Sequence, residues 1–166
     1  MLKKRYVIVI SVLLFLLLLL SGILLFRSCS DDAENPSSLP HDSNAVDWGG
    51  NQHLPGASDS AGKIAISGFD SLVFLANHTN QKVNFYNPSV NKDRLFLMTL
   101  YIGDIAYWQS GYCPAGNGYY DIELSQPLEK GEYTGFLKIQ VFKPDGTEVN
   151  GAKVKFDLLV KDEVSE

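Results

Sequence analysis

The side chains best suited to chemistry in this sequence are a pair of carboxylates. Asp121 and Glu123 are two positions apart in a stretch that alternates like a β-strand, so they share one face. Paired carboxylates can act as acid and base, or as acid and nucleophile, in glycoside hydrolysis. A solvated strand face explains the same spacing, and we favour that interpretation.

Other catalytic and metal-binding patterns are missing from the sequence. The three histidines lie far from one another, and none stands at metal-ligand spacing from another His, Cys or Glu. No Ser lies in a Gly-x-Ser-x-Gly elbow, and the glycine-rich stretch 111–118 precedes a strand, whereas a phosphate loop opens a helix. Four Asp residues stand at expected turns, where a Ca²⁺ site remains an alternative: Asp70, Asp93, Asp104 and Asp145. We expect no enzymatic activity, no metal and no cofactor.

A group of aromatic residues forms the candidate binding surface. Its members are Tyr107, Trp108, Tyr112 and Tyr119, with Tyr120 beside them. Alternation puts the neighbours Tyr107 and Trp108 on opposite faces of a strand, and Tyr119 and Tyr120 likewise. One ring of each pair should therefore face solvent or a groove, where aromatics stack on sugars or anchor protein partners. The competing interpretation places most of these rings in the core or at its rim.

The N-terminal region predicts a single membrane-spanning helix. Lys3, Lys4 and Arg5 precede an apolar run at 6–27 that is long enough to cross a bilayer as a helix. A cleaved signal peptide has a shorter apolar region and a small-residue cleavage site, which is poor here. Basic residues stay on the cytoplasmic side. We expect residues 1–5 in the cytoplasm, a retained signal anchor at 6–27 and the rest outside the cell.

The two cysteines leave separate questions open. Cys29 follows the apolar run and offers an alternative, a lipoprotein cleaved before this residue and lipidated on it, although Arg27 fits the required pattern badly. Cys113 lies in the expected globular part, and two cysteines are too few for a disulfide-stapled domain. We expect Cys113 to be unpaired, buried and inert, with an exposed thiol or a disulfide to Cys29 as the alternatives.

The charge balance argues against nucleic-acid binding. Of 14 Lys and Arg residues, four lie in the first 27 positions, which leaves 10 against 19 Asp and Glu. Residues 28–166 therefore carry a formal net charge of −9, which phosphate backbones would repel.

The chain beyond the apolar run divides into a linker and one domain. Residues 28–62 are rich in Ser, Asp, Asn, Gly and Pro, a composition that predicts a flexible linker. Trp48 interrupts this polar run, and the sequence leaves open whether it docks on the domain or lies in solvent. From residue 63 the pattern changes to a period of two. The expected strands are 63–66, 72–76, 82–86, 94–102, 105–109, 119–124, 133–142 and 153–161.

These short strands predict an all-β, immunoglobulin-like Greek-key sandwich of seven or eight strands over residues 63–162. The stretch 94–102 is apolar on both faces, as expected for a strand inside a sheet rather than at its edge. In 119–124, Tyr120, Ile122 and Leu124 should share one face. Leu128, Gly131 and Tyr133 have the spacing of a tyrosine corner, in which the phenol hydrogen-bonds to nearby upstream backbone.

The stretch 63–160 resembles a family of small membrane-anchored cell-envelope proteins of Gram-positive bacteria, chiefly Firmicutes. The resemblance rests on five segments: Gly-Lys-Ile-Ala-Ile at 62–66, Val-Asn-Phe-Tyr-Asn-Pro at 83–88, Trp-Gln-Ser-Gly at 108–111, Pro-Ala-Gly at 114–116 and Leu-Glu-Lys-Gly-Glu-Tyr at 128–133. Ser67 stands where the family has Pro, so the turn after the first strand is expected to differ. The resemblance implies one membrane helix, a polar linker and one sandwich, in some members on mobile or conjugative elements. It implies no catalytic residues.

We therefore expect a single-pass protein of the cell membrane whose extracellular sandwich is a non-enzymatic interaction module. Its partner would be another protein or a cell-wall component, in surface adhesion or in the assembly of a conjugative element. The alternative is a carbohydrate- or peptidoglycan-binding module that uses exposed aromatics. A hydrolase that uses Asp121 and Glu123 is a third and remote hypothesis.

Overall fold

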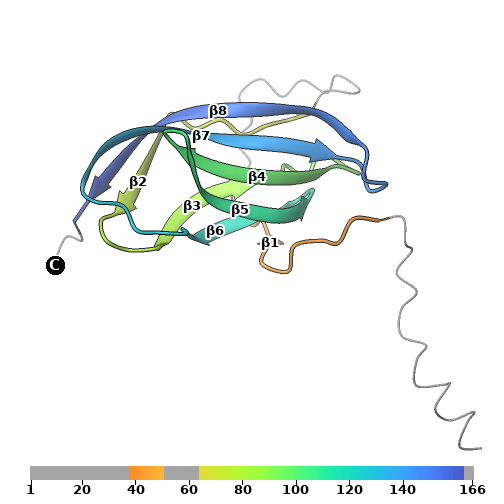
Figure 1. Ribbon diagram of the computed structural model, residues 1–166. Coiled ribbons are helices and arrows are strands. Elements are labelled where there is room, and N and C mark those ends of the chain that lie inside the picture. Colours follow the sequence, from red (N-terminus) through yellow and green to blue (C-terminus); the bar gives the residue numbers. More distant parts are fainter. Residues whose placement is uncertain (1–37, 51–63, 163–166) are drawn as a thin grey trace, which may run out of the picture. The chain divides into compact units, whose positions relative to one another are not determined.

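The computed structural model describes residues 38–50 and 64–162, and this part of the chain is built of strands without a helix (Figure 1). The strands are β1 (Val46–Asp47), β2 (Ser71–Leu75), β3 (Asn80–Tyr86), β4 (Leu95–Ile102), β5 (Ile105–Pro114), β6 (Asn117–Glu123), β7 (Gly131–Phe142) and β8 (Glu148–Lys161). The predicted span at 6–27 and Cys29 lie outside the described residues. Within those residues, no helix is long and apolar enough to cross a membrane.

Five strands form the larger sheet, in the order β2-β8-β7-β4-β5. All neighbours are antiparallel except β2 and β8, which run parallel. The apolar strand β4 has a partner on each side, as its pattern predicted. Gly103 adopts a φ of 58° in the two-residue turn that pairs Ile102 with Ile105, so the strands expected at 94–102 and 105–109 form a hairpin.

The smaller sheet has the order β1-β6-β3 and is antiparallel. Its β3–β6 ladder shifts register between Lys82 and Phe85. Such an irregularity changes the phase of the side chains. Tyr119 therefore faces the core, whereas Tyr120 is 38% exposed. The prediction that Tyr120 shares a face with Ile122 and Leu124 is wrong for this reason.

The two sheets enclose one apolar core, so the prediction of an all-β sandwich is confirmed. The alternating strand β8 contributes Phe156, Leu158 and Val160, each at most 4% exposed, and turns its lysines outward. The smaller sheet contributes Val83, Phe85, Tyr119 and Ile122. The described sandwich residues belong to one compact unit at 37–166.

Tyr133 ties the start of β7 to the preceding loop. Its hydroxyl donates a 2.9 Å hydrogen bond to the carbonyl oxygen of Glu129, four residues upstream. This is the hydrogen bond that the predicted tyrosine corner required.

Two segments differ from the sequence-based expectation. Residues 64–66 are not a strand, because the Asn91 side chain bonds both the N–H and the carbonyl of Ala65 and takes the place of a ladder partner. Residues 38–50, predicted as part of a flexible linker, lie on the sandwich and contain β1. We call residues 38–50 the strap.

Candidate functional site: the groove that holds the strap

The strap lies where the edges of the two sheets meet. β5 is the last strand of the larger sheet, and β6 would be an edge of the smaller sheet without β1. The Asp42 N–H donates to the carbonyl of Tyr112 on β5 at 2.9 Å, and the Trp48 N–H donates to the carbonyl of Gly116 at 2.8 Å. One segment thus pairs with backbone from both sheet edges. We call the surface formed by Gly111, Tyr112 and Gly116 to Tyr120, with Tyr86, the strap groove.

Asp42 is the polar anchor of the strap. Its Oδ2 accepts a 2.7 Å hydrogen bond from the Gly111 N–H and another of 2.7 Å from the Tyr119 hydroxyl. Its Oδ1 accepts from the Asn44 N–H at 2.9 Å. Burial raises the pKa of Asp42, but these donors outweigh it, so the pKa lies below its usual value. At neutral pH the strap is therefore held by a carboxylate.

Trp48 is the apolar anchor of the strap. Its indole stacks between two tyrosine rings, with centroids 4.7 Å from Tyr86 and 4.4 Å from Tyr120 and interplanar angles of 9° and 13°. The Tyr120 hydroxyl also accepts a 3.1 Å hydrogen bond from the Gly49 N–H. Among the described residues, Trp48 Nε1 is buried without a partner. Stacking, rather than a side-chain hydrogen bond, therefore holds the indole.

Two glycines let the strap approach this closely. A Cβ at Gly118 would stand 2.8 Å from the Trp48 ring and 2.6 Å from the carbonyl oxygen of Phe85. A Cβ at Gly111 would stand 2.9 Å from the Cβ of Asp42. The groove therefore has a glycine under each of the two anchors.

The four predicted binding residues lie close to one another, but they do not form an open aromatic surface. Tyr107 and Tyr119 are buried, at 9% and 3% exposed. Trp108 is half-buried, with its ring 5.1 Å from Tyr119 in an edge-to-face contact. Tyr112 is half-buried and packs edge-on against Phe142 at 5.3 Å. The interpretation of these rings as core and rim fits them better than exposure does, and Tyr112 and Tyr119 contact the strap.

Cys113 is free and buried beneath this groove. Its Sγ lies 3.3 Å from the carbonyl oxygen of Asn117, and burial raises the pKa of the thiol to about 12. Burial and the hydrogen bond to Asp42 also raise the pKa of Tyr119. Both groups stay protonated at neutral pH, so neither is an activated nucleophile. Cys29, the alternative lipidation site, lies outside the described residues.

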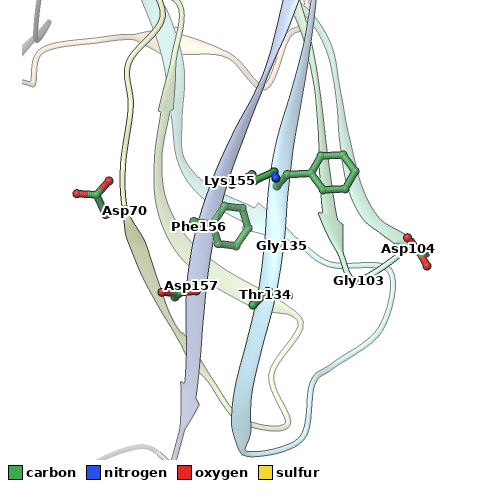
Figure 2. A pocket seen from close by; sticks show the side chains of 9 residues that line it. Asp70, Gly103, Asp104, Thr134, Gly135, Lys155, Phe156 and Asp157 are labelled. Atoms are coloured by element: carbon green, nitrogen blue, oxygen red, sulfur yellow. The ribbon is translucent and has the colours of Figure 1, made fainter.

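Asp121 and Glu123 lie on the solvent-facing side of β6, with the buried Ile122 between them, as the interpretation of a solvated strand face requires. Asp121 forms an ion pair with Lys82, and both side chains are exposed, as is Glu123. Asp70, Asp104 and Asp157 line a depression at one end of the larger sheet, where Figure 2 shows Asp70 and Asp104 on opposite sides of it. In residues 38–50 and 64–162, no group of three or more His, Cys, Asp or Glu could hold a metal ion.

The side of the larger sheet turned away from the core forms a second notable surface, which we call the outer face. Tyr101 and Phe136 stack there at 4.7 Å and 11°, and Lys153 Nζ lies 4.9 Å from the Phe136 centroid. Lys138 is paired directly with Lys153 across β7 and β8. Two like charges opposite each other on a sheet are unfavourable.

The outer face continues toward the β2 edge. Val73 and Leu159 are paired across β2 and β8 and are 51% and 44% exposed. The outer face therefore combines a lysine-topped aromatic stack with an exposed apolar pair.

Sequence reasoning found part of the strap and of its groove. It singled out Tyr112 and Tyr119 for aromatic clustering, and it left the docking of Trp48 open. It missed Asp42 and Tyr86, because Asp in a polar run and Tyr in a strand are common. The one available signal was a lone Trp in a stretch with few other apolar residues.

Searches of family models, curated proteins and solved structures found no match to this chain.

Proposed function

We propose that this protein is a single-pass membrane protein whose extracellular sandwich binds another protein or a cell-wall component and catalyses no reaction. The apolar run at 6–27 behind a basic cluster supports the anchor and its orientation. The burial of Cys113 and the solvated strand face that holds Asp121 and Glu123 support a binding role. The resemblance to Gram-positive envelope proteins suggests surface adhesion or conjugative assembly as the setting.

We further propose that the sandwich is immunoglobulin-like. In support, the larger sheet carries a parallel pair at one edge, β2 with β8, followed by antiparallel β7, β4 and β5. The tyrosine corner places Tyr133 near the start of the long strand β7, as the corresponding Tyr lies near the start of strand F in that fold. The smaller sheet pairs β3 with β6, as strands B and E pair there.

The outer face is the observation that carries the proposed binding role. Stacked aromatics, a lysine and an exposed apolar pair share one broad surface of the larger sheet. Aromatic residues are enriched at protein interfaces and carry much of their binding energy. Docking of the strap leaves ten residues, 28–37, between the proposed span and the sandwich. Fully extended, ten residues span at most about 35 Å.

Site-specific photocrosslinking in cells tests this role. A crosslinking side chain placed at Lys155 on the outer face should yield a discrete adduct. The same crosslinking side chain placed at Lys82, which is exposed on the smaller sheet, should yield little of this adduct. Equal adducts at both positions, or none, would argue against the outer face.

The anchor has its own test. Protease applied to intact cells should degrade the sandwich, and mass spectrometry should find Cys29 unmodified in a chain that keeps its first 27 residues. An acylated Cys29 at a new N-terminus would instead establish the lipoprotein.

The sugar-binding alternative has less support. Tyr107 and Tyr119 are buried, and Trp108 and Tyr112 are half-buried with their rings packed edge-to-face against other aromatic rings. Flat aromatic surfaces that stack on sugars need a free face. Binding to purified wall glycan would nonetheless favour this alternative, provided that Trp108→Ala abolished the binding and left the fold intact.

A further inference from the structure

We propose that the strap groove is a peptide-binding site for a segment with Asp six positions before Trp, and that the strap of a second copy of this chain is its ligand. In each copy the same groove also accepts that copy's own strap. This inference goes beyond the proposed function and does not depend on the membrane anchor.

The ligand chemistry follows from two separate recognition points. One is a pair of donors, the Gly111 N–H and the Tyr119 hydroxyl, which both bond one carboxylate oxygen at 2.7 Å. The other is a slot for a flat ring, with Tyr86 and Tyr120 as walls and Gly118 as floor. Between the two points the strap turns at Ser43 and Asn44, where the Ala45 N–H donates to the Asp42 carbonyl at 3.2 Å and the Asn44 N–H to Asp42 Oδ1 at 2.9 Å. A ligand therefore needs both groups and a sequence between them that can make this turn.

Backbone pairing between the two points fixes the direction of the segment. Val46 and Asp47 pair antiparallel with Gly118 and Asn117. This is the addition of a strand to a sheet edge, in which main-chain hydrogen bonds give affinity and pockets give specificity.

None of these contacts requires the strap to belong to the same chain. The side-chain hydrogen bonds that hold it join residues 69, 71 and 77 positions apart. Residues 51–63 join the strap to the rest of the sandwich, and thirteen residues reach about 45 Å when extended. A domain of about 100 residues has a radius of gyration near 13 Å. A strap can therefore reach the groove of an adjacent copy, and reciprocal exchange would give a two-fold symmetric dimer.

A chain's own strap competes with any other ligand, because a short tether gives it an effective concentration in the millimolar range. The test must weaken this competitor. A fluorescent peptide of residues 38–50 is added to the full chain in detergent micelles, as wild type and as Trp48→Ala. We expect the Trp48→Ala chain to bind the peptide roughly tenfold or more tightly than wild type does.

Matched controls distinguish binding in the groove from nonspecific binding of the peptide. A peptide that carries Trp48→Ala or Asp42→Ala should lose at least about tenfold in affinity, since each change removes one recognition point. The Phe136→Ala chain, which loses a stacked ring outside the groove, should bind the peptide as weakly as wild type does. A folded Trp48→Ala chain that ignores the peptide, or binds all three peptides equally, overturns the proposal.

A second experiment tests exchange between copies and leaves both anchors intact. Asp47 and Asn117 are direct partners across β1 and β6. One chain carries Asp47→Cys and the other Asn117→Cys, both with Cys29→Ser, and the two are co-expressed. If straps are exchanged, co-expression of the two chains gives a disulfide-linked dimer on a non-reducing gel. Co-expression of either cysteine variant with a chain that carries only Cys29→Ser gives no such dimer. No dimer in the mixed sample would show that the strap stays with its own sandwich.

Discussion

Two aromatic stacks on opposite sheets of this sandwich have nearly the same geometry but different neighbours. In the strap groove, Trp48 lies between Tyr86 and Tyr120 with centroid distances of 4.7 and 4.4 Å. On the outer face, Phe136 lies between Tyr101 at 4.7 Å and the ammonium group of Lys153 at 4.9 Å. The first stack is completed by a residue from far along the chain, and the second by residues of adjacent strands.

The difference indicates which stack holds the fold together. The smaller sheet has few strands, and without the strap its strand β6 would present an open edge, a liability for a sheet. The larger sheet fixes its own outer stack by register, because Tyr101 pairs with Phe136 across β4 and β7. Mutations in the groove should therefore change stability, and mutations on the outer face should mainly change binding.

The largest effect is expected at the floor of the groove. A methyl group at Gly118 would overlap the Phe85 carbonyl and the Trp48 ring, so Gly118→Ala must displace backbone or eject the strap. We expect a loss of about 3 kcal/mol in unfolding free energy, measured by urea denaturation. The control is Gly68→Ala, where nothing lies within 4 Å of the added Cβ. Equal losses for the two variants would show that the groove is not closely packed.

The next effect compares the two stacks directly. Trp48→Ala removes the apolar anchor of the strap and should cost about 2 kcal/mol, below the value for a fully buried Trp because this one is half-buried. Phe136→Ala should lower the free energy of unfolding by about 1 kcal/mol, because it removes the ring that stacks on Tyr101 and contacts the Lys153 ammonium group. Hydrogen exchange adds a local readout. The Asp42 and Trp48 amides should lose protection in Trp48→Ala only, and loss in both variants would contradict the separation of the two surfaces.

A smaller effect is expected from the polar anchor, and it depends on pH. Because the folded pKa of Asp42 lies below the unfolded value, its contribution is fully present above the unfolded pKa and is lost as pH falls through the folded pKa. Asp42→Asn should cost about 1 kcal/mol at neutral pH and reduce the pH dependence of unfolding below about pH 4.

Asp145 requires a control for this measurement. Hydrogen bonding to Thr147 also lowers the pKa of Asp145, in the β7–β8 turn. Asp145→Asn should leave the acid sensitivity of the Asp42 and Trp48 amides intact. If Asp42→Asn shows the acid profile of wild type at those amides, the carboxylate does not hold the strap.

The same two regions show how far sequence reasoning reaches. Strand β8 was predictable because its alternation of apolar and polar residues is local, and the tyrosine corner at Tyr133 because its bond spans four residues. The strap was not predictable, since β1 has only two residues and its partners lie about seventy positions away. Local composition in such a segment indicates only that it is polar.

The aromatic residues show a second limit. Clustering singled out Tyr112 and Tyr119, which contact the strap. Strict alternation put Tyr120 on the wrong face, because the register shift in the β3–β6 ladder cannot be read from one strand. The buried Tyr119 also donates a hydrogen bond from its hydroxyl to the Asp42 carboxylate, which lies 77 positions away in the chain. Which aromatics are free to bind a partner is therefore a tertiary property.

The smallest effect on stability is expected on the outer face, from its lysines. Lys153→Ala loses the contact with Phe136 but relieves the repulsion from Lys138. Each contribution is below about 1 kcal/mol, so the free energy of unfolding should change by less than about 0.5 kcal/mol. Lys138→Ala relieves the same repulsion without that loss, and it should be the more stable variant at low salt. High salt should shrink this difference, because it screens the repulsion between exposed charges. The photocrosslink from position 155 is then measured in the Lys153→Ala protein. A weaker crosslink at unchanged stability would assign the outer face to binding. An unchanged crosslink would show that Lys153 is not part of the interface.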